Sequence, residues 1–310
     1  MATADLNTLC SQSVPFFFIS DFEGEHLSCY PLDTLADEDI EFEFNASGEV
    51  HHTELKKDPV DFESYQRKLL TVQEYIRKGE TYLLNLTQPT PVISDLSLQE
   101  IFQRADAPYK LRYKDNFVCF SPEKFIEIID NKIYTYPMKG TIDASLPNAE
   151  KTILNDEKEM AEHLMVVDLL RNDLGIVANT IRVEKFRYID KIKAGEKSLL
   201  QISSKISGVM PDNWKGRIEE ILKALLPAGS ISGTPKKRTV EIIKEVEGYD
   251  RGYFTGVFGY FDGSNLYSAV MIRFIEMTGT GLIYKSGGGI TIESVAEREY
   301  EEMLDKVYLP

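Results

Sequence analysis

The sequence predicts an α+β fold in which large, mainly antiparallel sheets pack against helices. Segments typical of strands and helices follow one another without the regular alternation that marks a parallel sheet. The strands 124–129 and 132–136 are joined by Asp130-Asn131, a pair suited to a two-residue hairpin turn with positive φ. Apolar residues recur at helical spacing over 60–78 and 155–174, which supplies helices to cover the sheets.

Residues 1–60 are predicted to form a shortened N-terminal cap region on a main unit that spans 61–310. Strands are expected at 16–20 and 40–44, and this region carries no chemical motif. The main unit has no internal repeat, low-complexity tract or evident linker. We therefore expect it to fold as one compact domain.

The predicted hairpin brings two reactive residue types together. Earlier in the chain, before this hairpin, we expect a helix over 60–78 and a strand over 82–86. In the hairpin Glu123 would lie opposite Met138, one position from Lys139. Prolines flank this open end, where they limit strand pairing, so a side chain can leave the ladder there and face a ligand.

Glycine-rich loops and a final helix complete the chain. The loop 229–235 leads into a helix that Thr234 caps. The last helix begins with a capping box of Ser294 and Glu297. Between these helices we expect strands at 254–261, at 266–275 and up to Ser286, before the glycines 287–289.

The composition excludes several classes of function. Of 310 residues, 50 are Asp or Glu and 35 are Lys or Arg, so the formal net charge is −15. This balance excludes nucleic acid bound through a general cationic surface. The apolar run 15–19 is too short to cross a membrane and lacks the basic flank of an export signal. The three cysteines lack motif spacing, which fits a reducing cytoplasm. From both observations we expect a cytoplasmic protein that binds no membrane.

Two predicted helices each carry a pair of glutamates on one face. Glu159 and Glu162 stand three residues apart, as do Glu299 and Glu302, which share their face with Lys306. If the two faces meet, four carboxylates converge and require a divalent cation, and oxygen ligands favour Mg²⁺. Each pair alone is more typical of a solvated helix surface, and Glu159 could also complete a capping box with Asp156.

Two further features are compatible with an anion site. Arg273 interrupts the apolar run 269–275, and a buried guanidinium requires a carboxylate or a bound anion as partner, unless the strand lies at an exposed edge. The loop 229–235 presents backbone N–H groups at a helix start. It lacks the Gly-Lys-Ser/Thr ending of a nucleotide-binding loop, which disfavours phosphoryl transfer.

Taken together, these segments resemble the chorismate-utilising enzyme family. The matching motifs occur in the family's order at residues 121–125, 137–141, 157–163, 167–175, 227–236, 272–273, 287–290 and 297–302. They extend over roughly residues 62–310, so the resemblance covers most of the chain. It implies the fold of anthranilate synthase component I and aminodeoxychorismate synthase, with 61–310 as a chorismate-binding catalytic domain.

Lys139 indicates the subgroup. In the corresponding Pro-x-x-Gly-Thr, other synthases of the family usually carry Ala, whereas aminodeoxychorismate synthase component I carries Lys. The resemblance thus implies replacement of the C4 hydroxyl of chorismate by an amino group, for 4-aminobenzoate and folate synthesis. Lys139 would attack C2 of the ring while Glu123 protonates the departing hydroxyl, and ammonia would then add at C4 and expel the lysine. This chemistry requires an uncharged amine and a protonated carboxylic acid.

The resemblance also implies the binding residues. Glu162 and Glu299 would ligate Mg²⁺ directly, with Glu159 and Glu302 acting through water, and the metal would hold the ring carboxylate. The remaining substrate contacts would come from Arg273, Lys306, Ser230, Gly287, Gly289, Gly140 and Thr141. The nitrogen would come from a separate glutamine amidotransferase subunit or from free ammonia, because no cysteine of this chain lies in a Gly-x-Cys-x-Gly motif.

Departures from the family pattern define the alternatives. Leu83 stands where isochorismate-type enzymes carry a lysine that activates water, and Gln201 and Phe254 replace a His and a frequent Tyr. The closest alternative is anthranilate synthase component I, or an enzyme with both activities, because every proposed residue except Lys139 serves either reaction. A non-catalytic anion-binding subunit is disfavoured, since binding needs no acid beside a nucleophile.

Overall fold

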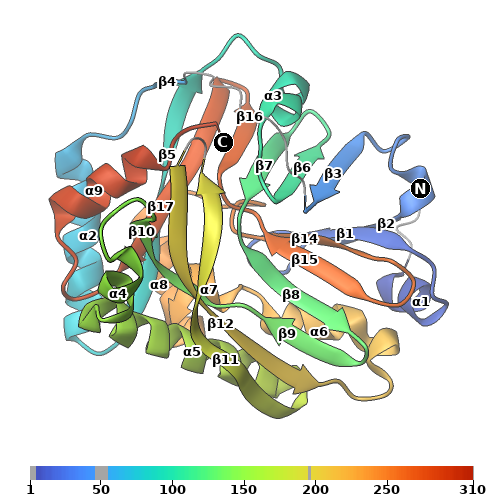
Figure 1. Ribbon diagram of the computed structural model, residues 1–310. Coiled ribbons are helices and arrows are strands. Elements are labelled where there is room, and N and C mark those ends of the chain that lie inside the picture. Colours follow the sequence, from blue (N-terminus) through green and yellow to red (C-terminus); the bar gives the residue numbers. More distant parts are fainter. Residues whose placement is uncertain (1–4, 46–54, 195–196, 310) are drawn as a thin grey trace.

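Two large sheets and the helices packed on them make up the molecule (Figure 1). A computed structural model describes residues 5–45, 55–194 and 197–309. The strands of the first sheet are β1 (Phe16–Ser20), β2 (Leu27–Pro31), β8 (Lys124–Ile129), β9 (Lys132–Thr135), β10 (Met138–Asp143), β11 (Asn179–Ala194), β12 (Lys197–Val209), β14 (Val257–Phe261) and β15 (Leu266–Val270). Those of the second are β3 (Ile40–Phe44), β4 (Lys56–Lys57), β5 (Leu83–Ile93), β6 (Tyr109–Tyr113), β7 (Phe117–Ser121), β13 (Gly233–Thr234), β16 (Phe274–Thr278) and β17 (Gly281–Ile290). The helices are α1 (Leu6–Ser11), α2 (Phe62–Arg77), α3 (Leu98–Arg104), α4 (Ala149–Leu154), α5 (Glu157–Val177), α6 (Ile218–Leu225), α7 (Gly229–Ser232), α8 (Lys236–Glu247) and α9 (Ala296–Asp305), with short 3₁₀ helices at Leu32–Thr34 and Trp214–Arg217.

Neighbouring strands run antiparallel in both sheets. The first sheet has the order β10-β12-β9-β8-β15-β14-β1-β2, and β11 also pairs with β12. The second has the order β13-β5-β17-β16-β7-β6-β3, and β4 also pairs with β5. These sheets and their helices confirm the predicted α+β class. From the first 60 residues, β1 pairs with β14 and β3 pairs with β6, and the boundary after residue 60 stays a prediction.

The predicted hairpin is present, but it ends sooner than expected. Asp130 and Asn131 have φ of 48° and 62°, and β8 and β9 pair on either side of this turn. After Thr135 the chain leaves β8, and β10 pairs with β12 instead. Glu123 therefore does not pair with Met138: its carbonyl accepts a hydrogen bond from the Val270 N–H at 3.1 Å.

The structure differs from the C-terminal prediction at the glycines 287–289 and at the helix starts: Pro235, not Thr234, is the N-cap of α8, and it makes no side-chain cap. The glycines 287–289 continue β17 and pair with β5. The two backbones approach so closely that a Cβ on Gly287 would lie 2.1 Å from the Leu86 carbonyl oxygen, so only glycine fits there. The capping box is wrong, since Val295 is the N-cap of α9 and makes no side-chain cap. The Ser294 hydroxyl instead accepts a hydrogen bond from the Thr291 N–H and donates one to Glu299 of α9.

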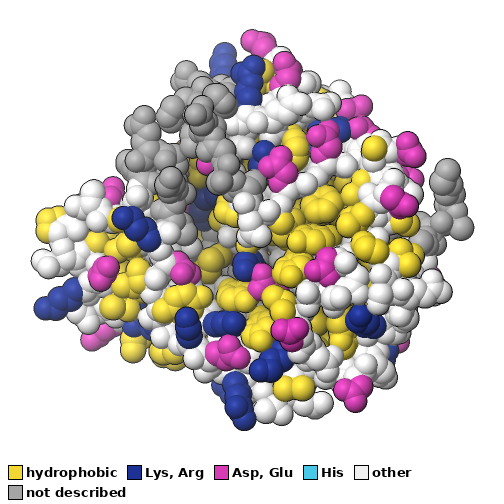
Figure 2. Space-filling view, turned by 45° about the vertical axis from the view of Figure 1, so that its right-hand side comes forward, with side chains coloured by type: hydrophobic (Ala, Val, Ile, Leu, Met, Phe, Trp, Pro, Cys, Tyr) yellow, Lys and Arg dark blue, Asp and Glu magenta, His cyan; other side chains and the backbone are white. Residues whose placement is uncertain are grey.

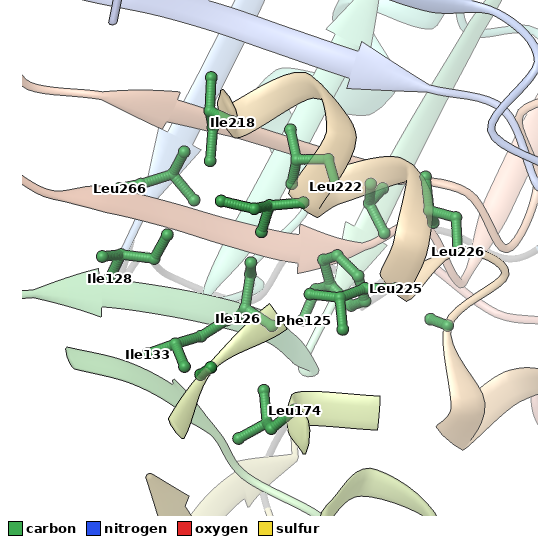
Figure 3. Close-up of a cluster of buried hydrophobic side chains, with 14 of the residues drawn as sticks. Phe125, Ile126, Ile128, Ile133, Leu174, Ile218, Leu222, Leu225, Leu226 and Leu266 are labelled. Atoms are coloured by element: carbon green, nitrogen blue, oxygen red, sulfur yellow. The ribbon is translucent and has the colours of Figure 1, made fainter. Parts of the chain in front are cut away.

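Separate apolar cores join the helices to each sheet. Side chains of α5 and α6, including Leu174, Leu222 and Leu225, pack against Ile126 and Leu266 of the first sheet (Figure 3). Helices α2, α8 and α9 cover β5 and β17 of the second sheet with another cluster. A third, aromatic-rich cluster includes side chains from both sheets. The core of the second sheet thus fixes β17, and pairing with β12 holds β10; these two strands carry the candidate site.

Charges are mixed on the molecular surface shown. Figure 2 shows acidic and basic side chains interspersed around a broad hydrophobic area. The net charge of −15 is therefore not gathered in one patch on this face. Within the described ranges, none of the helices is both long enough and apolar enough to span a membrane.

Candidate active site

Lys139 projects from β10 toward the glycines of β17. Its Nζ lies 3.3 Å from Glu162 Oε2 of α5, and its side chain is 24% exposed. A Cβ placed on Gly289 would lie 3.4 Å from this Nζ and 3.2 Å from Leu83 Cδ1. The amine therefore lies where both sheets and α5 meet, in contact with Glu162 and beside an aliphatic side chain.

A β-bulge sets the direction of Lys139. The register of β10 against β12 shifts between Lys139 and Thr141, around Gly140, whose φ is 76°. A bulge of this kind bends the strand and redirects its side chains. Thr141 is exposed and lies opposite Gln201 on β12.

Glu123 is half-buried immediately before β8. Burial raises the pKa of its carboxyl group, while a hydrogen bond with Ser230 and the charges of Lys139 and Lys306 lower it in turn. Burial is the largest of these effects. Glu123 and Lys139, expected to be neighbours, are thus electrostatically coupled, although no hairpin pairing joins them.

A second charged group approaches the same glycines from α9. A Cβ on Gly288 would lie 3.6 Å from Glu299 Oε2, 3.6 Å from Glu302 Oε1 and 3.7 Å from Lys306 Nζ. Lys306 Nζ donates to the Gly287 carbonyl at 2.8 Å and pairs with Glu302 Oε1 at 2.7 Å. The predicted helix face therefore points at the glycine strand.

The two glutamate pairs approach β17 and β10 without forming a cluster. Glu159 Oε2 lies 3.1 Å from the position of a Cβ on Gly140, and Glu162 binds Lys139. Over residues 5–45, 55–194 and 197–309, no three acidic, cysteine or histidine side chains lie close enough together to hold a metal ion. The carboxylate donors suit Mg²⁺ chemically, and the metal site formed with Glu299 and Glu302 stays a prediction.

Arg273 lies where the chain passes from β15 to β16. It has a φ of 50°, a left-handed conformation that non-glycine residues seldom adopt and that often marks a functional site. The carbon at the centre of its guanidinium lies 5.3 Å from the centroid of the Tyr308 ring, which follows Lys306 by two residues. The Arg273 side chain thus lies beside Tyr308, just after the end of α9.

Gln73 supports the start of α9 and was not expected from the sequence. Gln73 of α2 donates to backbone carbonyls of the 291–294 loop at 2.9–3.3 Å. Within that loop the Ser294 hydroxyl donates to Glu299 Oε1 at 2.8 Å. The available signal was the position of Gln73 four residues after Leu69, which places an amide on the buried face of α2.

Other buried polar residues also lay outside the sequence prediction. His163 of α5 contacts the Ser204 hydroxyl through Nε2 at 2.7 Å. Arg251 and Glu247 form an ion pair in the interior. Their spacing of four residues is a common surface pattern, so it gave no reason to expect burial.

The sequence profile of the chorismate binding enzyme family matches residues 24–309. The chain belongs to this family. A PabA-like protein of Haemophilus influenzae is 51% identical over 96% of this chain and 93% of its own length. Aminodeoxychorismate synthase component 1 of Bacillus subtilis is 31% identical over 81% of this chain and 55% of its own length. Anthranilate synthase component 1 of Haloarcula marismortui is 34% identical over 79% of this chain and 52% of its own length.

A solved structure confirms the fold of this chorismate binding enzyme. Anthranilate synthase component I of Streptococcus pneumoniae superposes with a TM-score of 0.70 at 25% identity, over 84% of this chain and 60% of its own. The expected fold type is therefore correct. This chain spans about half the length of its synthase relatives.

Proposed function

We propose that this enzyme aminates chorismate at C4 to give 4-amino-4-deoxychorismate. The observation that supports this most directly is the placement of Lys139. Its Nζ faces Gly289 and Glu162 inside the site, where a lysine pointing into bulk solvent would have contradicted the proposal. The resemblance drawn from the sequence motifs associates this lysine with aminodeoxychorismate synthases.

The proposed reaction proceeds in two displacements. Lys139 Nζ forms a bond to C2 of the ring, the two conjugated ring double bonds shift, and the C4 hydroxyl leaves as water after it takes a proton from Glu123. Ammonia then bonds to C4, both double bonds shift back, and the lysine leaves C2. The added nitrogen loses a proton, so the overall exchange is ammonia for water. A carboxyl group with a raised pKa is suited to hold the proton that the first step needs.

Positive charges around the glycines are suited to a dianionic substrate. Lys306 and Arg273 would bind the enolpyruvyl carboxylate together with Ser230 and the backbone of Gly287 and Gly289. Gly140 and Thr141 would shape the wall beside Lys139. Glu159, Glu162, Glu299 and Glu302 would hold Mg²⁺, which when bound supplies positive charge for the ring carboxylate.

The nitrogen source and location belong to the same proposal. Ammonia would reach the site from a separate glutamine amidotransferase subunit, and the product would serve 4-aminobenzoate and folate synthesis. The reduced, buried state of Cys10, Cys29 and Cys119 is compatible with a cytoplasmic enzyme.

Anthranilate synthase activity, alone or in addition, remains the second candidate. It is favoured by one observation: relatives of both names have similar identity to this chain, 31% and 34%. A product assay with chorismate, Mg²⁺ and ammonium, followed by a lyase that converts 4-amino-4-deoxychorismate to 4-aminobenzoate, separates the two. Predominant anthranilate formed without the lyase would refute our assignment.

The variant Lys139→Ala is expected to lose formation of 4-amino-4-deoxychorismate entirely, because the first bond to C2 cannot form. The same coupled assay measures the product. The exposed Lys237 provides the matched control, since Lys237→Ala removes an equal charge away from the site and should retain full turnover. Wild-type rates in Lys139→Ala would exclude the nucleophile role.

A further inference from the structure

A buried ion pair lies beneath the candidate active site, and none of the proposed steps uses it. Arg251 and Glu247 are each 3% exposed. Arg251 Nη2 lies 2.6 Å from Glu247 Oε1, and Nε lies 2.9 Å from Oε2. Burial of two charges carries a desolvation cost that apolar side chains of similar size avoid. Stability alone is therefore a poor explanation for this pair.

The guanidinium of Arg251 uses its full set of five N–H donors. Besides the two bonds to Glu247, Nη1 donates to the Ile231 carbonyl and to Thr255 Oγ1, both at 3.2 Å. Nη2 also donates to the Asn85 carbonyl at 2.7 Å. A planar group bound in this way is fixed in position and orientation. It ties together backbone segments that are far apart in the sequence.

Both backbone acceptors of Arg251 adjoin groups of the site. Ile231 follows Ser230, whose hydroxyl hydrogen-bonds with Glu123. Asn85 lies opposite Gly289 in the β5–β17 ladder, and Gly289 is the residue over which Lys139 Nζ lies.

Glu247 holds the same strand at a second point. Its Oε1 accepts hydrogen bonds from Thr87 N at 2.7 Å and from Thr87 Oγ1 at 2.8 Å. Thr87 lies opposite Gly287, whose carbonyl binds Lys306. The ion pair thus contacts β5, the strand paired with glycines 287–289, at the two positions opposite Gly287 and Gly289.

We propose that Arg251, held by Glu247, is a positioning residue that fixes helix α7, which carries Ser230, relative to the glycines 287–289 of β17. In this way it sets the separation between Glu123 and Lys139. The inference rests on the proposed function, in which these two residues act on one substrate ring. A misplacement of about 1 Å costs on the order of 100-fold in rate when reacting groups must be aligned.

The double variant Arg251→Met/Glu247→Leu tests this role, because it removes both charges and leaves neither one buried alone. We expect a folded protein with kcat lowered about 10- to 100-fold. We also expect the alkaline limb of the kcat profile to move to higher pH. The hydrogen bond with Ser230 and the charge of Lys139 both lower the pKa of Glu123, so their displacement raises it. A purely structural role would leave this limb in place.

A second buried arginine, whose carboxylate partners are exposed, supplies the control. Arg112 on β6 is 4% exposed and pairs with Asp39 and Glu41, several strands away from β17 in the second sheet. Arg112→Met is expected to lower stability without moving the pH profile. A folded Arg251→Met/Glu247→Leu enzyme with wild-type kcat and pH profile would overturn the proposal.

If the double variant does not fold, Arg251→Lys decides the question by the same two readouts. Lysine keeps the charge but offers three donors in place of five, so it cannot reproduce the connections. Unchanged kcat and an unchanged alkaline limb again overturn the role. The proposed function fails on a separate result, the absence of 4-amino-4-deoxychorismate from wild-type reactions. The comparison of variant and wild type still tests the positioning role on whichever product is formed.

Discussion

At Glu123, burial and neighbouring charges act in opposite directions on one carboxyl group. Burial prevails and raises its pKa. As the pH rises through that pKa, the carboxyl group loses the proton it must donate, so kcat is expected to fall on the alkaline side. Glu123→Gln cannot donate a proton at any pH and should lower kcat about 10²- to 10⁴-fold.

Glu127 offers a control on β8, the strand that begins directly after Glu123. It is 8% exposed and binds Lys124 and Tyr136 at 2.6 Å each. Glu127→Gln should therefore affect stability more than turnover. Equal turnover in Glu123→Gln and wild type, measured with the coupled lyase assay, would exclude Glu123 as the general acid.

His163 links the candidate site to acid stability. Burial, followed by the charges of Arg187 and Lys139, lowers its pKa from 6.5 to about 4. Because the unfolded chain takes up this proton first, the contribution of His163 to stability is complete above pH 6.5 and is lost as the pH falls toward 4. The loss is expected to reach about 3 kcal/mol.

Denaturant unfolding at pH 7 and at pH 4 measures this contribution. His163→Gln should show a smaller decline in the free energy of unfolding between these two values than wild type. The carboxylates elsewhere in the chain contribute equally to both proteins, so the difference isolates one side chain. Identical declines would mean that His163 takes up its proton at its ordinary pKa in the folded state.

Among the elements, β17 and α9 owe their arrangement to a short loop. Ser294 accepts a hydrogen bond from Thr291 N–H and donates to Glu299. If Glu299 binds Mg²⁺ as proposed, loss of this support in Ser294→Ala should weaken Mg²⁺ affinity about 10- to 100-fold. Isothermal titration of Mg²⁺ in the presence of chorismate measures the change.

The exposed Ser145 provides the matched control for this titration. Its hydroxyl donates to Asp143 within its own turn, so Ser145→Ala should leave Mg²⁺ affinity unaltered. Equal affinities in Ser294→Ala and wild type would show that the loop does not orient a metal ligand.

The elements also show how far local signals reach. The turn at Asp130-Asn131 depends on backbone conformations of two adjacent residues, and the hairpin was predictable for that reason. The partner of β10 depends on strands outside the hairpin, and it is β12. The same limit explains why 287–289 was expected to follow a strand, although the opposite strand β5 continues the ladder through it.

For the whole molecule, the proposed nitrogen source makes a clear prediction. The isolated chain should form 4-amino-4-deoxychorismate with ammonium but not with glutamine, because it carries no glutaminase motif of the Gly-x-Cys-x-Gly type. The rate with ammonium should rise with pH while Glu123 stays protonated. Uncharged ammonia, and not ammonium, attacks C4, and its fraction increases with pH. Product formation from glutamine by the chain alone would contradict a separate amidotransferase.

The sequence by itself determined the family, the α+β class and the residue types of the candidate site. Ordered motifs and local turn chemistry do not depend on long-range packing, and Lys139 and Glu123 could be selected on those grounds. How the two side chains come together was decided by the tertiary structure. Glu123 precedes β8, Lys139 projects from β10 at a bulge, and β17 supplies the glycines. The role of Arg251 likewise became visible only there, because its acceptors are backbone carbonyls. Every residue carries such a carbonyl, so no sequence pattern marks the ones that a buried guanidinium will bind.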